Sequence, residues 1–161
     1  MIIQIDSREK SKAITKIIAE FDKQNIQHPS SKLFVGDYMN YDNPRLIIDR
    51  KQNLAELCSN VCQQHKRFTD ELKRANEFGI KLIILCEHGG KIDSLESVNT
   101  WYNPRLKTSP MAVSGQRLFK ILYSIGKKYD VDFEFCTKAQ TGKRIIEILG
   151  GDKDDKFCTT D

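Results

Sequence analysis

Two acidic residues and a lysine that could act on a phosphodiester lie on either side of one turn. Asp37 precedes the turn signal Asp-Asn-Pro at 42–44, and Asp49 and Lys51 follow it. If the turn is centred near Asn43, Asp37 lies opposite Asp49, and Lys51 shares their face of the hairpin. Two carboxylates so close repel unless a cation lies between them. The pattern therefore predicts a Mg²⁺ or Mn²⁺ site for phosphodiester chemistry.

An ordinary polar hairpin face is the alternative interpretation of the same residues. Asp and Lys commonly occupy the solvent-facing positions of strands, and a one-residue change of register would send every side chain to the other face. Taken alone, these residues leave both interpretations open.

Size and composition limit the classes of protein to be considered. The 161 residues predict a single domain with a real core, and the net charge of +4 is compatible with nucleic acid without being diagnostic. No apolar run approaches the ~18 residues of a membrane span, and the start lacks the basic segment of a signal peptide. We expect a cytoplasmic protein with no membrane partner. Because neither GxxxxGK[ST] nor GxGxxG is present, no nucleotide cofactor is expected.

The five cysteines do not form a metal-binding pattern. Their odd number and the lack of a CxxC pair predict reduced thiols. Cys58 and Cys62 are four residues apart and share a helix face. Core packing is favoured for them over a zinc site, because no further ligand cluster is available.

Apolar periodicity and turn residues predict an alternation of strands and helices. In the first half we expect a strand at 1–6, a helix at 14–23, the hairpin at 33–51, helices at 54–61 after Asn53 and at 68–78 before Gly79, and a strand at 80–86. In the second half we expect a short helix at 92–98, a loop at 101–107, a helix at 118–129, a strand at 131–135, a helix at 145–149 and a disordered polar tail at 152–161. This order predicts an α/β fold, with a sheet of mixed direction flanked by helices.

Five motifs in this order resemble the nuclease domain of the XPF family of structure-specific endonucleases. They are Asp-Ser-Arg-Glu at 6–9, Val-Gly-Asp-Tyr at 35–38, Ile-Asp-Arg-Lys at 48–51, Arg-Phe-Thr-Asp-Glu at 67–71 and the strand at 80–86. The resemblance covers residues 2–87. It implies a restriction-endonuclease-like fold and Mg²⁺- or Mn²⁺-dependent cleavage of branched, flap or junction DNA. The nuclease domain is expected to span 1–151, with the helix-strand-helix unit at 115–149 completing the sheet.

The resemblance also implies roles for single residues. Asp37 and Asp49 correspond to metal ligands, and Asp6 corresponds to an acid that supports the metal directly or through water. Lys51 corresponds to a residue that orients or activates the attacking water, or stabilises the charge that develops on the phosphate.

Three arginines match family positions: Arg8, Arg50 and Arg67. Contact with substrate phosphates and structural ion pairing are both open for each of them. A structural role is open for Glu9.

The chain departs from the family pattern at two positions of the motif. Asp49 stands where the family usually has Glu, and Ala55 stands where an acid is common, with Glu56 next to it. A tandem helix-hairpin-helix module is not recognisable either, so other basic residues must help to hold DNA.

Further DNA contacts are expected from basic and aromatic side chains. The candidate basic residues are Lys66, Arg67, Lys73, Arg74, Arg105, Lys107, Arg117 and Lys120. Trp101 and Tyr102 could stack on an exposed base, although packing on their own domain is the more common role of such residues. His65 could approach the site.

The expected function is a metal-dependent endonuclease of DNA repair or recombination, as in a phage or mobile element in a bacterial cytosol. The resemblance implies a homodimer. One alternative is an inactive DNA-binding scaffold, but Asp37, Asp49 and Lys51 are all retained. The other alternative is a small interaction or inhibitor protein with the same fold.

Overall fold

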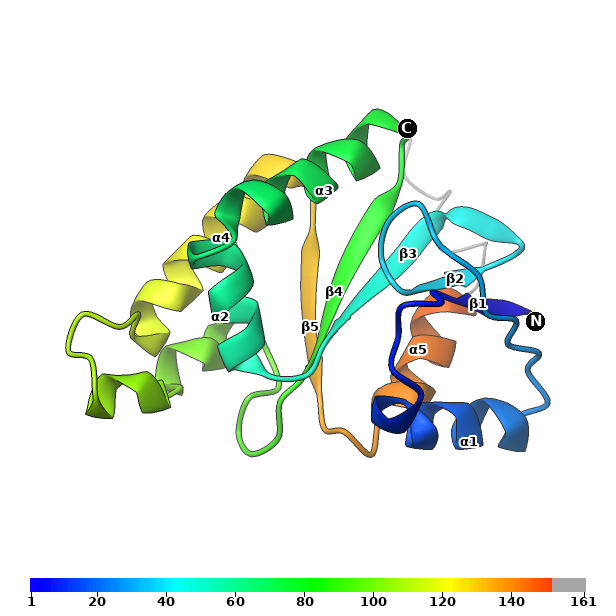
Figure 1. Ribbon diagram of the computed structural model, residues 1–161, viewed down its shortest axis with the longest axis horizontal. Helices are drawn as coiled ribbons and strands as arrows, with labels where there is room; N and C mark the ends of the chain where they lie inside the picture. Colours follow the sequence, from blue (N-terminus) through cyan, green and yellow to red (C-terminus); the bar gives the residue numbers. More distant parts are fainter. Residues whose placement is uncertain (152–161) are drawn as a thin grey trace, which may run out of the picture.

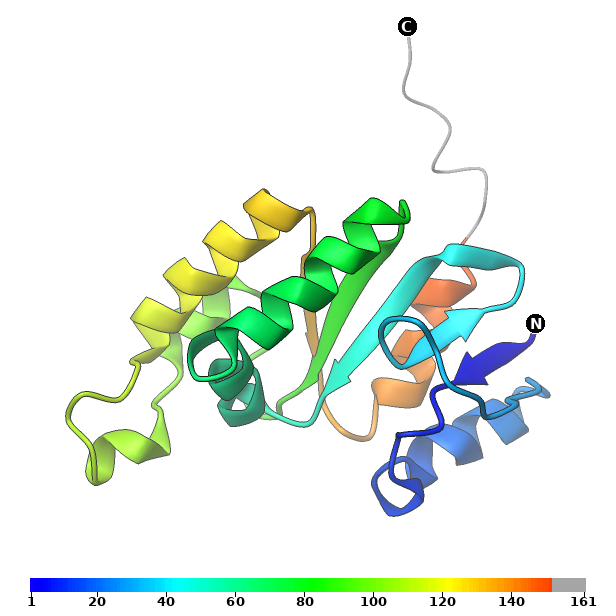
Figure 2. The same cartoon turned by 45° about the horizontal axis from the view of Figure 1, so that its top comes forward.

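One mixed sheet forms the centre of the molecule. The computed structural model describes residues 1–151, and the expected tail lies outside the described residues. The strands are β1 (Ile3–Ile5), β2 (Tyr38–Asn40), β3 (Asn43–Lys51), β4 (Lys81–Glu87) and β5 (Asp132–Cys136), adjacent in chain order. β2 runs antiparallel to both of its neighbours, β1 and β3, whereas β3, β4 and β5 run parallel (Figures 1 and 2). The predicted α/β sheet of mixed direction is therefore confirmed.

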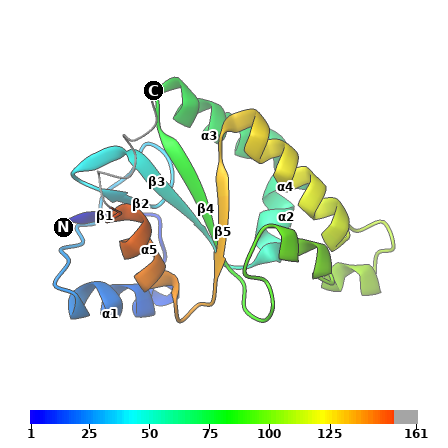
Figure 3. The same ribbon diagram turned by 180° about the vertical axis from the view of Figure 1, so that it is seen from behind.

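Helices cover both faces of the sheet (Figures 1 and 3). They are α1 (Thr15–Lys23), α2 (Leu54–Cys62), α3 (His65–Glu77), α4 (Gly115–Tyr129) and α5 (Thr141–Leu149). α2, α3 and α4 pack on one face, and α1 and α5 on the other, each layer closing its own cluster of buried apolar side chains. Within the described residues, no helix is both long and apolar enough to cross a membrane.

β3 separates the two layers by the alternation of its side chains. Ile47 packs in the cluster under α2, α3 and α4, whereas Ile48 packs in the cluster under α1 and α5. Because side chains alternate along a strand, Asp49 and Lys51 share the face of Ile47, and Arg50 takes the opposite face. Asp49 and Lys51 therefore lie on the face of the sheet that α3 covers.

The turn of the hairpin is not where the sequence placed it. It lies at Tyr41 and Asp42, and β3 begins at Asn43, which was the expected centre. A bulge between Met39 and Asn40 shifts the register, and beyond it Tyr38 pairs with Ile48. Residues 44–46 of β3 have no partner on β2 and offset the displaced turn, so that Asp37 still faces Asp49.

Local sequence signals explain where several helices begin and end. The Asn53 side chain accepts a hydrogen bond from the backbone N–H of Glu56 at 2.8 Å and caps α2, as expected. α3 ends before Gly79, whose φ of +64° favours glycine. The expected loop at 101–107 instead contains a 3₁₀ turn, Pro104–Lys107, because Asn103 caps it and Pro104 suits its first position.

Other parts of the chain also differ from the elements expected there. A 3₁₀ helix at Glu96–Thr100 replaces the helix expected at 92–98, and α5 begins at Thr141, four residues before the expected 145. Residues 33–37 are not part of a strand, although the hairpin was expected to include them. This irregular segment passes beside α3, and it carries Asp37 at its end.

Candidate active site

Asp37 and Asp49 form a pair of facing carboxylates at the end of the hairpin. The backbone N–H of Asp37 donates to the carbonyl of Ile48 at 2.8 Å, and Oδ2 of Asp37 accepts from the backbone N–H of Arg50 at 2.7 Å. Burial, the charge of Asp49 and then that of Glu9 raise the pKa of Asp37 well above its usual range. A hydrogen bond between the two carboxyl groups contributes to the same shift. Two carboxylates this close repel each other, and a cation bound between them would relieve that repulsion.

Lys51 lies beside this acid pair, on the same face of β3. Its Nζ is 3.4 Å from Oδ2 of Asp49 and 5.8 Å from the centre of the Phe68 ring. Burial by itself would lower the pKa of Lys51, but the charges of Asp49 and Asp37 outweigh it and raise that pKa. Lys51 is therefore a cation at neutral pH, and a cation donates hydrogen bonds rather than accepting a proton.

Glu71 on α3 is a further acid at this site, to which the sequence had assigned no role. Its Oε1 accepts the backbone N–H of Gly36 at 3.1 Å. Burial and the charge of Asp49 raise the pKa of Glu71. The signal was available, because Glu71 belongs to the Arg-Phe-Thr-Asp-Glu motif and lies one helical turn after Arg67, on the same helix face.

Glu56 bears on the question raised by Ala55. Glu56 lines a hollow of about 240 Å³ together with Lys51, Arg67 and Glu71, whereas Ala55 lines a different hollow. Its charge also contributes to raising the pKa of Lys51. An acid therefore lies close to Lys51 even though position 55 carries none.

Asp6, for which the resemblance implied support of the metal directly or through water, is engaged by protein donors. Its carboxylate accepts the side chain of Arg8 at 2.8 and 2.7 Å, the backbone N–H of Arg8 at 2.8 Å and that of Leu33 at 2.9 Å. Burial alone would raise the pKa of Asp6, but these hydrogen bonds lower it. With both oxygens engaged by protein donors, Asp6 fits a positioning role better than that of a metal ligand. Its backbone N–H donates to the carbonyl of Asp37 at 2.8 Å.

Of the two roles left open for Arg50, the structure favours ion pairing over contact with substrate. Its guanidinium is 4% exposed and pairs with Glu9 at 2.8 Å and Glu87 at 2.6 Å. The hydroxyl of Tyr38 donates to the same oxygen of Glu9 at 2.9 Å. The structural alternative therefore holds for Arg50 and Glu9, on the opposite face of the sheet from the acid pair.

A groove lined mainly by basic side chains lies on the surface beside the hollow that contains Lys51 and Glu71. An open hollow of about 560 Å³ is lined by Arg8, Phe34, Lys66, Arg67, Asp70, Glu71 and Arg74. It shares Arg67 and Glu71 with the hollow that contains Lys51. Arg8 and Arg67, both exposed, thus lie where phosphates could approach, as do Lys66 and Arg74, whereas Lys73 is not among the lining residues.

Several other expected DNA contacts lie elsewhere. Trp101 is only 9% exposed and packs in the core, which is the role that the sequence favoured over stacking on a base, whereas Tyr102 is 58% exposed. His65, Arg117 and Lys120 line a separate hollow between α3 and α4, rather than the groove.

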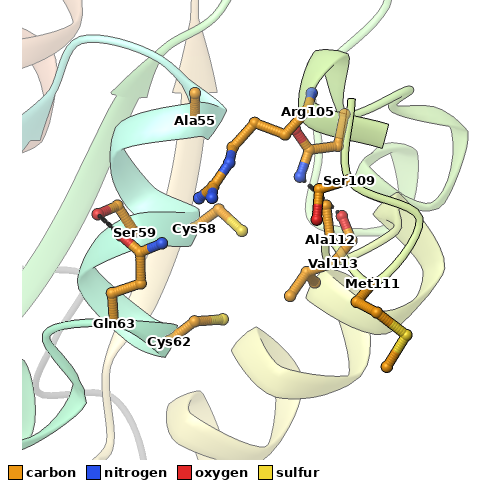
Figure 4. A pocket seen from close by; sticks show the side chains of 11 residues that line it. Ala55, Cys58, Ser59, Cys62, Gln63, Arg105, Ser109, Met111, Ala112 and Val113 are labelled. Carbon is orange, nitrogen blue, oxygen red and sulfur yellow. Dashed lines mark hydrogen bonds between the residues drawn. The ribbon is translucent and has the colours of Figure 1, made fainter. Parts of the chain in front are cut away.

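Cys58 and Cys62 face the hollow that Ala55 also lines, between α2 and the segment before α4 (Figure 4). The guanidinium of Arg105 points into it from the other side, and Met111 lies at its edge (Figure 4). Cys58 is buried and Cys62 packs against the core, as expected, and both thiols are free. Cys158 lies outside the described residues.

The donor set fits a hard divalent cation that keeps other oxygen ligands. Within residues 1–151, no three His, Cys, Asp or Glu side chains gather closely enough to hold a metal by themselves. Mg²⁺ is usually bound by one or two carboxylates, with water and substrate phosphate completing its shell. Asp37 and Asp49 meet that requirement.

Fold and site together define a restriction-endonuclease-like domain with a carboxylate pair and an adjacent lysine. The profile of the ERCC4 domain family matches residues 5–148, and the chain belongs to that family. This agrees with the XPF-type nuclease domain that the motifs indicated. No curated protein matches the chain.

Two solved structures share the fold. XPF from Aeropyrum pernix matches with a TM-score of 0.65 at 15% identity, covering 92% of this chain and 63% of that chain. XPF from Aeropyrum pernix in complex with DNA matches with a TM-score of 0.66 at 16% identity, covering 99% of this chain and 68% of that chain. This chain thus spans about two thirds of the length of these XPF chains.

Proposed function

We propose that this protein is a Mg²⁺- or Mn²⁺-dependent DNA endonuclease that hydrolyses phosphodiester bonds at branched, flap or junction DNA. One observation carries the proposal. Asp37 and Asp49 face each other across β2 and β3, with Lys51 on the same face beside a groove rimmed by basic side chains.

The acid pair would hold the divalent ion. Bound there, the ion would supply Lewis-acid polarisation of the phosphate and an activated water. Asp37 is kept in place by the backbone N–H of Arg50 and by its own N–H bond to Ile48. Both contacts use the backbone of β3, so the position of Asp37 is as rigid as the sheet.

Lys51 would stabilise the negative charge that develops on the phosphate. Three roles were open for it, but its raised pKa argues against accepting a proton from water. A preorganised cation at a position where charge develops typically contributes a factor of about 10²–10³ to the rate. The contact with Asp49 limits where its ammonium group can lie.

The groove would hold the sugar-phosphate backbone of DNA. Arg8, Lys66, Arg67 and Arg74 line it, and all four are exposed. Contacts from such residues to phosphates are independent of sequence and weaken with salt. The preference for branched DNA is part of the proposal, as are a homodimer and a cytosolic location.

The alternative function is a DNA-binding scaffold without activity. Such a scaffold does not need a lysine beside an acid pair, nor a buried acid whose pKa is raised by its neighbour. The intact site therefore favours the enzyme over the scaffold and over a small inhibitor protein.

Cleavage of a panel of labelled DNAs tests the proposal. Flap, fork, four-way and plain duplex DNA are incubated with the protein in Mg²⁺, Mn²⁺ or EDTA. We expect metal-dependent cuts near the branch, and loss of cutting in Asp37→Asn. Asp42→Asn makes the same chemical change at the exposed turn of the same hairpin and should cut normally. Binding without cutting in any metal would favour the scaffold.

A further inference from the structure

Two aromatic rings stand exposed on the surface beside the groove. Phe34 is 54% exposed and Phe78 is 63% exposed. Their ring centres are 4.8 Å apart in an edge-to-face arrangement. Phenylalanine is usually buried in folded proteins, so a contiguous exposed pair calls for an explanation.

The pair lies at the basic end of the groove. Phe34 lines the same hollow as Arg8, Arg67 and Glu71, and also an adjoining hollow of about 600 Å³ that includes Lys32. The guanidinium carbon of Arg74 is 5.9 Å from the centre of the Phe34 ring. An aromatic face beside basic side chains is the arrangement with which proteins hold single-stranded nucleic acid.

Phe34 is also held firmly and close to the acids. Its neighbours Leu33 and Val35 are both buried, and the backbone of Leu33 is bonded to Asp6. Asp37 follows Phe34 by three positions along the chain, so their Cα atoms are at most about 11 Å apart. At roughly 3.4 Å per phosphate along a stacked strand, that span covers up to about three nucleotides.

The close packing of Gly36 fixes the same segment. A Cβ at Gly36 would lie 2.5 Å from the Ile47 side chain, and its φ is +67°. The irregular segment therefore approaches β3 as closely as a glycine allows. The ring of Phe34 is thus presented from a rigid support rather than from a loose loop.

We infer that Phe34, supported edge-on by Phe78, is a stacking platform for one unpaired base of the DNA, within about three nucleotides of the cleaved phosphate. Arg8 and Arg74 contact the neighbouring phosphates. Bases inside a duplex already stack on one another and offer no free face. The platform therefore selects the unpaired nucleotide next to a junction and sets the distance from junction to cut. This inference rests on the proposed function and adds a structural basis for the preference for junctions.

Charge complementarity favours DNA over a protein occupant. The two hollows that Phe34 lines carry five basic side chains, Arg8, Lys32, Lys66, Arg67 and Arg74, against two acids, Asp70 and Glu71, which gives a net positive rim suited to phosphates. A protein partner for an exposed apolar patch would not require such a rim. Self-association through the rings is nevertheless a distinct outcome that the experiment can recognise.

Binding and stacking can be measured separately from cleavage in the Asp37→Asn background. Forked DNA carries 2-aminopurine at successive positions of its single-stranded arm, and stacking quenches its fluorescence. We expect quenching at one position within about three nucleotides of the wild-type cut. Phe34→Leu should abolish that quenching and weaken fork binding about five- to tenfold, since stacking on an aromatic ring contributes about this much or more. Binding of plain duplex should change less than twofold.

Two variants make the comparison specific. Phe34→Trp keeps an aromatic face and should retain quenching, whereas Tyr41→Leu removes a ring that is 47% exposed at the hairpin turn and should have no effect. In the cleaving protein, Phe34→Leu should spread the cut over several positions.

Three results would overturn the inference. Unchanged quenching and fork affinity in Phe34→Leu would refute it while leaving the proposed function intact. Equal losses of affinity for fork and duplex DNA in Phe34→Leu would also refute the inference. A change in self-association by light scattering, with DNA binding unaltered, would assign the rings to a protein contact. A wild-type protein that neither binds nor cuts any DNA would overturn the proposed function itself.

Discussion

Replacing Asp37 by Asn should stabilise the protein while abolishing its activity. The amide has almost the same shape as the carboxyl group, and its oxygen can still accept the 2.7 Å hydrogen bond from the Arg50 backbone. The substitution removes a buried carboxyl group whose charge would be repelled by those of Asp49 and Glu9. Removal of a strained functional group typically raises the free energy of unfolding by about 0.5–2 kcal/mol. For a chain of this size, that is about 1 to 8 °C in Tm.

The gain in stability of Asp37→Asn over wild type should depend on pH in a defined direction. The pKa of Asp37 is higher in the folded protein than its ordinary value of 3.8. As pH rises above that value, the unfolded carboxyl loses its proton first, so wild-type stability falls relative to the variant. The Asn protein should therefore match wild type in acid and exceed it increasingly toward neutral pH. Thermal melts of both proteins in EDTA, at a series of pH values from acid to neutral, would measure the difference in Tm.

A divalent ion should offset the stability advantage of the Asn protein. At ten times its dissociation constant, an ion that binds only the folded state stabilises it by about 1.4 kcal/mol, or about 3 to 6 °C. Wild type should show this rise in Mg²⁺ or Mn²⁺, and Asp37→Asn should show little. Destabilisation of the Asn protein in EDTA, or equal stabilisation of both proteins by metal, would refute the reasoning. Asp42→Asn should behave as wild type throughout.

Three further substitutions test other parts of the site. Lys51→Met should slow cleavage about 10²- to 10³-fold and leave fork affinity, measured by fluorescence anisotropy, nearly unchanged; an equal loss of affinity would contradict its role in charge stabilisation. Arg50→Ala should lower the free energy of unfolding by about 3–5 kcal/mol in urea melts, because Glu9 and Glu87 would be left as buried unpaired charges. Arg67→Gln should reduce the slope of log affinity against log salt by about 0.7–0.9 if it contacts one phosphate, and an unchanged slope would exclude that contact.

The hairpin pairing was predictable because it depends on a count of residues. Asp37 and Asp49 are equidistant from Asn43, and the observed register of Tyr38 with Ile48 agrees with that count. The position of the turn was not predictable to the residue. The register shift accommodates three extra residues on β3 without any strong sequence signal, so the errors in the turn and in the register offset each other.

The roles of Asp6 and Arg50 could not be read from spacing. Asp6 is engaged by the backbone of Leu33, 27 residues away, and Arg50 by Glu87, 37 residues away. Both partners come from segments whose approach is set by tertiary packing rather than by local periodicity. Glu71 differs, because its helix position relative to Arg67 already placed both on one face.

Arg50 explains how the chain keeps a strained acid pair in place. Its side chain lies on one face of β3, where Glu9, Glu87 and, through Glu9, the Tyr38 hydroxyl hold it. Its backbone N–H points within the sheet to the carboxylate of Asp37. The ion pairs of Arg50 therefore hold β3 in place on one face of the sheet, and Asp37 and Asp49 lie on the other face. Loosening the network should move Asp37 even though none of its charged members touches the substrate, which makes Arg50 a positioning residue for the metal site.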